Sequence, residues 1–169
     1  MSKSIVFANP ADIELLADPI PSHWIIEGCP EARSRRLAES ADGTSSTMAW
    51  SCSTGRFHWH YAVDETLHII SGEVVVTDEK GRMRRLGPGD MAFFPAGSRS
   101  IWHVTVDVRK IAFCRHVMPR PLGTLLRAWN KFIDRLTGFS IDVADAPLAP
   151  DIDRRVAIDV LQAERAPSP

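Results

Sequence analysis

Two histidines separated by one residue are the side chains of this sequence best placed to do chemistry. His58 and His60 flank Trp59, and Glu65 follows shortly after them. Side chains two apart on a β-strand point to the same face, so both imidazoles can aim at one point. Glu65 would follow a short turn, at the start of the next strand, where it can approach that point. Such a set of two histidines and a carboxylate suits divalent iron, manganese, nickel or zinc and leaves coordination positions open.

The same residues also have structural interpretations. His58 and His60 could make structural hydrogen bonds instead of binding a metal or a substrate. Glu65 could form an ion pair with a basic residue such as Arg99 or Lys110. These alternatives stay open on the spacing alone.

The region that carries these residues is predicted to be a series of short β-strands. Turn signals such as Gly87-Pro88-Gly89-Asp90 separate the segments between residues 45 and 117. Many short strands with regular turns indicate a barrel or a sandwich. The expected strands are Met48–Ser53, Arg56–Ala62, Thr66–Ile70, Glu73–Thr77, Met83–Leu86, Met91–Phe94, Arg99–Val106 and Lys110–His116.

The N-terminal part, residues 1–44, is mixed in character, and its prolines interrupt any long helix. A short helix is expected at Pro10–Ala17, with Asn9 as its cap. Ser34–Ser40 is expected to be a lead-in strand. We therefore expect this segment to pack on the barrel.

The C-terminal part, residues 118–169, has helical periodicity. An apolar stripe predicts a helix over Pro121–Thr137, which Gly138 ends. This amphipathic helix would pack on the barrel or across a dimer contact, and a membrane-surface helix is a weaker alternative. Arg155–Gln162 could be a short strand or a helix.

The spacing of these residues resembles the two sequence motifs of the cupins. The first is matched by a glycine, His58-x-His60, four residues, Glu65, six residues and Gly72. The second is matched by Gly89, five residues and Pro95-x-Gly97. Over about residues 33–116 the chain is similar to the ureidoglycine aminohydrolase-like subfamily, also called DUF861. The matching residues include Trp50, Phe57, Trp59, Tyr61, Asp64-Glu65-Thr66, Gly72-Glu73-Val74, Phe94-Pro95-Ala96-Gly97, Trp102 and Val108-Arg109-Lys110.

This resemblance implies an all-β fold, an RmlC-like jelly roll or antiparallel β-barrel, with a pocket at its open end. Its third metal histidine is Ser100 here, so the implied metal set is His58, His60 and Glu65. Ser100, Trp102 and Phe94 are expected to line the pocket. The resemblance also implies chemistry on small nitrogen- or oxygen-rich metabolites, and a homodimer.

Strand parity sets a condition on this site. If His58 and His60 face inward, then Phe57, Trp59 and Tyr61 face outward and need cover from residues 5–40 or from a second subunit. The opposite parity would bury the aromatic rings and leave both histidines in water. The resemblance favours the histidines inside.

Composition narrows the functional classes. The chain has 169 residues, a net charge of −1 and three scattered cysteines. This balance does not favour nucleic-acid binding, and the cysteine spacing does not favour a zinc–thiolate site or disulfides. No apolar run is long enough to span a bilayer. We therefore expect a cytoplasmic protein with a small-molecule ligand and no nucleic-acid or membrane partner.

Three functions remain. The first is a metal-dependent enzyme that acts on a small polar metabolite. The second is a non-catalytic cupin that binds a small ligand or a metal as a sensor or accessory protein. The third is a structural or assembly partner with a vestigial pocket.

Overall fold

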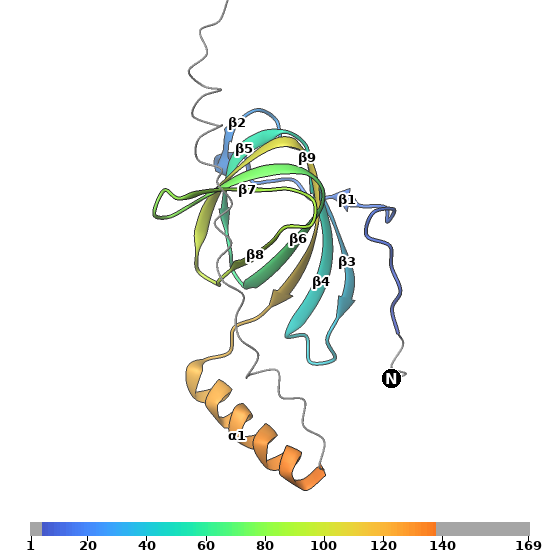
Figure 1. Cartoon of the computed structure of the whole chain (residues 1–169), viewed down its shortest axis with the longest axis vertical. Helices are drawn as coiled ribbons and strands as arrows, with labels where there is room; N and C mark the ends of the chain where they lie inside the picture. The colour runs from blue at the N-terminus through green and yellow to red at the C-terminus, as the bar shows by residue number, and fades with distance from the viewer. Residues whose placement is uncertain (1–4, 138–169) are drawn as a thin grey trace, which may run out of the picture. The chain divides into compact units, whose positions relative to one another are not determined.

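The computed structural model describes residues 5–137, and the expected all-β barrel is confirmed (Figure 1). These residues form nine strands, a short 3-10 helix η1 (Ser22–Trp24) and one α-helix. The strands are β1 (Leu16–Ala17), β2 (Ile25–Glu27), β3 (Ala32–Glu39), β4 (Ser45–Cys52), β5 (Gly55–His60), β6 (Asp64–Asp78), β7 (Met83–Leu86), β8 (Met91–Phe94) and β9 (Arg99–Arg115).

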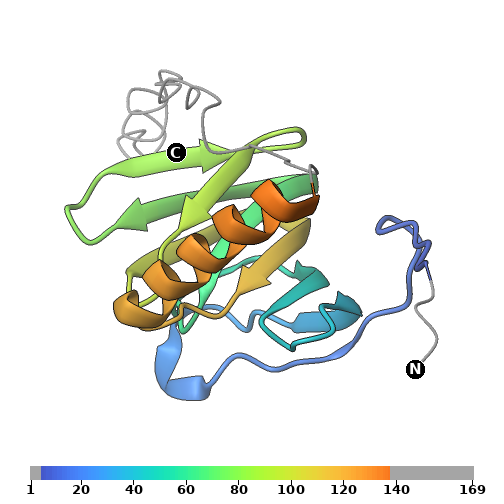
Figure 2. The same ribbon diagram turned by 90° about the horizontal axis from the view of Figure 1, so that it is seen from below.

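Strand β9 is the centre of the sheet. Its first half pairs with β5 and its second half with β4, while β6 runs antiparallel along its other edge. Beyond β4 the sheet continues with β3 and β1, and beyond β5 with β2. Strands β7 and β8 pair with the two halves of β6. The sheet therefore curls round an inner face, as Figures 1 and 2 show.

Strand β6 bends where the sequence predicts a break. Thr66–Ile70 and Glu73–Thr77 belong to one strand, whose register against β9 shifts around the bend. Gly72 makes the bend possible, because its φ is +79° and a Cβ there would lie 2.0 Å from the carbonyl oxygen of Asp107. Only glycine allows β6 and β9 to approach so closely at this point.

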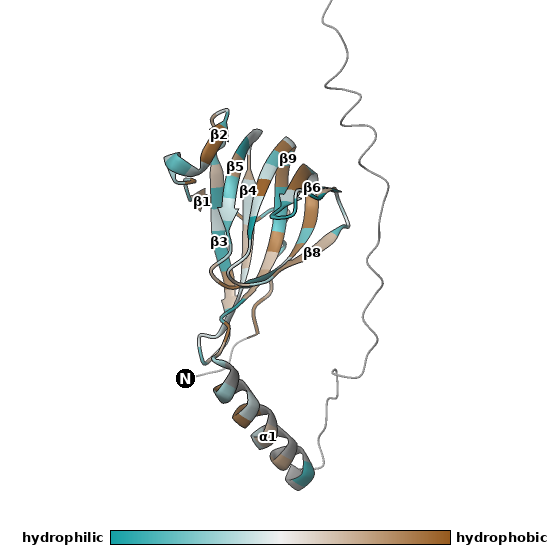
Figure 3. Ribbon diagram, turned by 90° about the vertical axis from the view of Figure 1, so that its left-hand side faces the viewer, coloured by the Kyte–Doolittle hydropathy of each residue, from teal (hydrophilic) through white to brown (hydrophobic). Residues whose placement is uncertain are grey.

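The inner face of the sheet is apolar and rich in aromatic rings. Polar and apolar side chains alternate along strands such as β9, which Figure 3 shows as teal and brown bands. Burial stabilises by about 25 cal/mol per Å² of apolar surface, so this face supplies most of the stability. Its largest fully buried side chains are Trp102, Phe57, Leu67, Ile69, Val74, Val104, Val108 and Cys52.

The helix predicted at Pro10–Ala17 is wrong. The chain makes a single turn, in which the backbone N–H of Ile13 donates to the carbonyl oxygen of Asn9 at 3.1 Å, and then pairs as β1 with β3. Arg109 of β9 donates to the carbonyl oxygens of Pro10 at 2.6 Å and Ile13 at 2.5 Å. Tertiary hydrogen bonds therefore satisfy backbone groups that a helix would otherwise satisfy.

Helix α1 (Arg120–Thr137) belongs to a second unit that starts at Val117. It occupies almost the same residues as the helix predicted from the apolar stripe. No helix among the described residues is long and apolar enough to cross a membrane. The element expected at 155–162 lies outside the described residues. Among the described side chains of α1, the large apolar ones that are exposed are Leu122, Leu125, Leu126, Trp129 and Phe132.

Candidate functional site

Two opposite charges are buried together on the inner face of the barrel. Glu65 lies at the start of β6, and Lys110 lies in the second half of β9. The Nζ of Lys110 donates to Oε1 of Glu65 at 2.5 Å, and the two side chains are only 3% and 10% exposed respectively. The structure therefore shows the ion pair that the sequence left open as an alternative for Glu65.

Aromatic rings surround the charged end of Lys110. Its Nζ lies 4.9 Å from the ring centroid of Trp50 and 4.7 Å from that of Trp102. The two indoles contact each other edge to face, with centroids 5.8 Å apart. A desolvated cation over such faces gains roughly 2 kcal/mol, so the rings share with Glu65 the stabilisation of the ammonium.

A buried hydroxyl extends this polar centre. The indole Nε1 of Trp102 donates to the hydroxyl of Tyr61 at 2.9 Å, and that hydroxyl shares a 3.2 Å hydrogen bond with Ser100. The ring of Tyr61 stacks on Phe94 with centroids 4.4 Å apart. Burial raises the pKa of Tyr61, so its hydroxyl stays protonated. The expected pocket residues Ser100, Trp102 and Phe94 therefore meet around Tyr61, a residue that the sequence interpretation placed outside.

The two histidines lie on the other side of β5. His58 and His60 are exposed, whereas Phe57 and Tyr61 are 0% and 3% exposed and Trp59 is half-buried. The expectation that both histidines face inward is therefore wrong, and the opposite parity is correct. The physical reason is area: each aromatic ring buries roughly 150–250 Å² of surface, while the imidazoles keep their hydration outside.

The barrel buries Phe57 and Tyr61, whereas Trp59 is half-buried and is partly covered by the N-terminal segment. The N-terminal segment adds one contact at this point. Trp24 of η1 meets Trp59 edge to face at 5.8 Å and stacks on His60 at 4.8 Å. Trp24 thus contacts side chains from both faces of β5.

These positions do not fit the metal that the cupin resemblance implies. Glu65 is engaged by Lys110, while His58 and His60 project from the outer face of β5. Ser100 is hydrogen-bonded to Tyr61. Within residues 5–137 no three histidine, cysteine, aspartate or glutamate side chains form a group that could hold a metal ion.

The cysteines near this centre are not activated. Burial raises the pKa of Cys52 to about 12. Burial, helped by the nearby carboxylate of Glu65, also raises the pKa of Cys114. Because the thiolate is the nucleophilic form, burial disfavours nucleophilic chemistry at both residues.

One buried donor at this centre has no partner. The indole Nε1 of Trp50 is buried, and no described residue accepts a hydrogen bond from it. Buried N–H groups in native proteins are nearly always paired. The ring whose face lies under Lys110 therefore has an N–H group that could donate to an acceptor outside the described residues.

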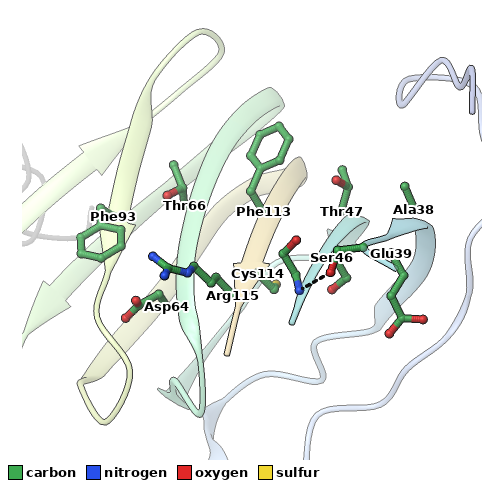
Figure 4. Close-up of a pocket in the computed structure, with 12 residues that line it drawn as sticks. Ala38, Glu39, Ser46, Thr47, Asp64, Thr66, Phe93, Phe113, Cys114 and Arg115 are labelled. Carbon is green, nitrogen blue, oxygen red and sulfur yellow. Dashed lines mark hydrogen bonds between the residues drawn. The ribbon is translucent and has the colours of Figure 1, made fainter. Parts of the chain in front are cut away.

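A separate hollow of about 580 Å³ lies on the outer face of the sheet (Figure 4). Neither Glu65 nor Lys110 lines it. Phe93, Thr66, Phe113 and Thr47 are successive cross-strand partners from β8 to β4 and so share one face. Phe93 and Phe113 are 60% and 48% exposed. The hollow is thus bordered by a row of two exposed phenylalanine rings and two threonines, and no described residue packs over those rings.

The curled antiparallel sheet with its inward polar centre is the architecture of a cupin. Residues 39–112 match the EutQ-like cupin domain. The chain is a small cupin, and it belongs with the EutQ-like and DUF861 proteins. None of the curated proteins matches the chain.

The chain is also similar to several solved structures. A DUF861 protein from Pseudomonas syringae is 25% identical, with a TM-score of 0.57 over 61% of this chain and 45% of that one. A DUF861 protein from Thermotoga maritima is 38% identical over 38% of this chain and 73% of that one, with a TM-score of 0.37. A cupin-like protein from Thermotoga maritima is 15% identical, with a TM-score of 0.51 over 63% and 81% of the two chains. The chain thus spans less than half of the Pseudomonas protein.

Proposed function

We propose that this cupin binds a small polar metabolite inside the barrel, with the Glu65–Lys110 pair as the recognition centre, as a sensor or accessory protein. One observation carries the proposal: two opposite charges are buried together among aromatic rings on the inner face. Such a centre combines apolar walls with a few convergent polar groups, which is typical of small-molecule sites.

Stability alone does not explain why the pair is there. Removing a carboxylate and an ammonium from water costs several kcal/mol for each ion, and their attraction often only offsets that cost. Apolar residues of similar volume would commonly give an equally stable barrel. The retained pair, together with the unpartnered Nε1 of Trp50, therefore favours a binding role.

The chemistry of the centre defines the class of ligand. Lys110 donates hydrogen bonds and the Glu65 carboxylate accepts them, and the two groups lie side by side. A planar amide or ureido group presents a carbonyl acceptor beside an N–H donor and so complements this pair. The indole N–H of Trp50 supplies one more donor, which a carboxylate on the ligand could use. An ureido acid satisfies all three groups.

A metal-dependent enzyme is the less well supported alternative. It requires His58, His60 and Glu65 to converge, and the two histidines lie on the outer face of β5. Fold membership does not settle the matter, since cupins host many unrelated activities.

A melting-temperature screen tests the proposal, with N-carbamoylglycine, acetamide and glycolate as probes. A ligand that binds only the folded state raises stability by about 2.7 kcal/mol at 100 times its Kd. We expect N-carbamoylglycine to raise the melting temperature of the wild type. The increase should be lost in Lys110→Met and kept in Lys80→Met, whose lysine is exposed.

Two results would contradict the proposal. One is a wild type that none of the three probes stabilises. The other is an equal increase in Lys110→Met. If Lys110→Met does not fold, Trp50→Phe provides a milder test, because it removes the unpartnered N–H and introduces no unpaired charge. The increase should then be smaller than in the wild type.

We also propose that the protein forms a homodimer through the outer face of β8 and β9. Met91, Phe93 and Phe113 are exposed there. Contiguous exposed apolar side chains on a sheet commonly mark an interface. These residues replace Phe57, Trp59 and Tyr61 as the aromatic surface that needs cover.

A further inference from the structure

Arg56 occupies the middle of a cross-strand row on the outer face of the barrel. The register of β5 pairs it with Glu27 of β2 on one side and with His103 of β9 on the other. This face is opposite to the one that carries Glu65 and Lys110. The row is therefore independent of the interior centre.

A hollow of about 340 Å³ opens beside this row. Part of its wall is backbone, because Gly28 and Gly55 carry no side chains and approach each other closely. Glu27, Arg56 and His103 supply its ionisable groups. The remaining lining residues are Thr54, Val104 and Thr105.

Arg56 is the unusual residue of this hollow. Its Nε is buried, and no described residue accepts a hydrogen bond from it. Several other arginines of the barrel are paired with carboxylates, as Arg82 is with Asp78 at 2.7 Å and Arg36 with Glu39 at 3.1 Å, and Arg109 donates to backbone carbonyl oxygens. A buried donor without an acceptor is destabilising, and such groups are rare in native proteins.

We infer that this hollow is a binding site for a small oxyanion, a phosphate or a carboxylate, with Arg56 as the principal ligand. The guanidinium presents Nε–H and Nη–H in a planar fork, which matches two oxygens of either group. His103 can donate a further hydrogen bond from its ring. The carboxylate of Glu27 opposes anions and so limits the affinity of the site.

An NMR titration of the wild-type chain with inorganic phosphate, and separately with acetate, tests this inference. We expect saturable shifts of the Gly28 and Gly55 amide signals with at least one of the two anions. Comparing the two titrations also shows which of the two anions binds more tightly. Arg56→Gln should weaken the binding about tenfold or more, as expected for the loss of a charge-assisted pair.

Two further variants separate a binding role from a structural one. Glu27→Gln removes the opposing carboxylate and should tighten the binding severalfold. Arg33→Gln, at an exposed arginine paired with Glu31, should leave it unchanged. Arg56→Gln should also keep the melting temperature of the wild type, because the buried Nε has no partner to lose.

The inference is overturned if neither anion gives saturable shifts at Gly28 and Gly55. It is also overturned if Arg56→Gln binds as tightly as the wild type. A large fall in melting temperature of Arg56→Gln in the absence of any anion would instead assign Arg56 a structural role. None of these results depends on a ligand of Glu65 and Lys110.

Discussion

Lys110 and Glu65 hold each other in a place where neither charge would be stable alone. Each lies on the inner face, and the surrounding rings of Trp50 and Trp102 offer the ammonium only a weak substitute for water. Removing one member of a buried pair leaves the other charge unpaired, which typically costs 3–5 kcal/mol. Removing both charges leaves no unpaired charge, so that stability then depends only on how well the new side chains pack.

Substitutions of this pair should therefore be strongly non-additive. We expect Lys110→Met to lower the free energy of unfolding by about 3–5 kcal/mol, because it leaves Glu65 buried and unpaired. The double variant Lys110→Met with Glu65→Leu should recover most of that loss. Urea denaturation measures both, with Lys80→Met as the control that changes little. Additive losses would show that the pair does not act as a unit.

The sequence predicted only some of the residues that form this site. The cupin resemblance implies Glu65 as a metal ligand, whereas the structure pairs it with Lys110, which the sequence left open as an alternative partner. Tyr61 was missed as an interior residue, although it shares strand parity with Phe57. That signal could have been used, but the competing histidine motif pointed to the opposite face.

Among the elements, strand β5 shows why alternation does not fix orientation. A period of two defines two faces and does not say which one is buried. His58 and His60 occupy one face, and three aromatic residues occupy the other. The aromatic face is the buried one because the rings bury more surface than the imidazoles would. Comparing the two faces requires knowing which strands lie beside β5. The strands themselves were predictable, since turn residues bound each of them.

Strands β6 and β9 show a second limit of prediction from sequence, which concerns where a strand ends. The sequence predicts two strands in place of each. Ser71-Gly72 is a turn signal between Thr66–Ile70 and Glu73–Thr77, and the expected strands Arg99–Val106 and Lys110–His116 leave a gap around Asp107. In the structure both strands continue through a shared bend. The approach of Gly72 to Asp107 that stabilises the bend joins residues far apart in the chain, so local signals cannot reveal it.

The exposed outer face of β8 and β9 predicts how two copies associate. We expect light scattering at micromolar concentration to give the mass of a dimer. Phe93→Glu combined with Phe113→Glu should give a monomer, because charges would replace the apolar row. Met83→Glu, at an exposed apolar residue on β7, should remain dimeric. A monomeric wild type, or a dimer that survives the double substitution, would contradict the proposed interface.

For the whole molecule, the resemblance to the two cupin motifs predicted the cupin class correctly, and these motifs include glycines and prolines such as Gly72, Gly89 and Pro95. Those residues determine the bends and turns of the barrel, as Gly72 does, and their roles do not depend on a ligand. The histidines of the same motif do not determine the fold, since a surface position on β5 accommodates them equally well. The fold was therefore predictable from motifs, whereas the chemistry required the direction of each side chain.

The N-terminal segment is the part of the barrel unit that local sequence predicted worst. Helix signals at Asn9 and Pro10 were outweighed by the pairing of β1 with β3 and by two hydrogen bonds from Arg109. Such tertiary contacts routinely override helix propensity. The boundary between this segment and the barrel is thus set by partners that lie elsewhere in the chain.

The most direct test of the account is a comparison of the His58→Ala/His60→Ala double variant with the wild type. Elemental analysis and the melting-temperature response to N-carbamoylglycine are measured on both. If the functional centre is the interior pair, the double variant keeps the full response of the wild type and the same metal content. Loss of both a stoichiometric metal and the ligand response in the double variant would contradict the account and return the functional centre to the histidines.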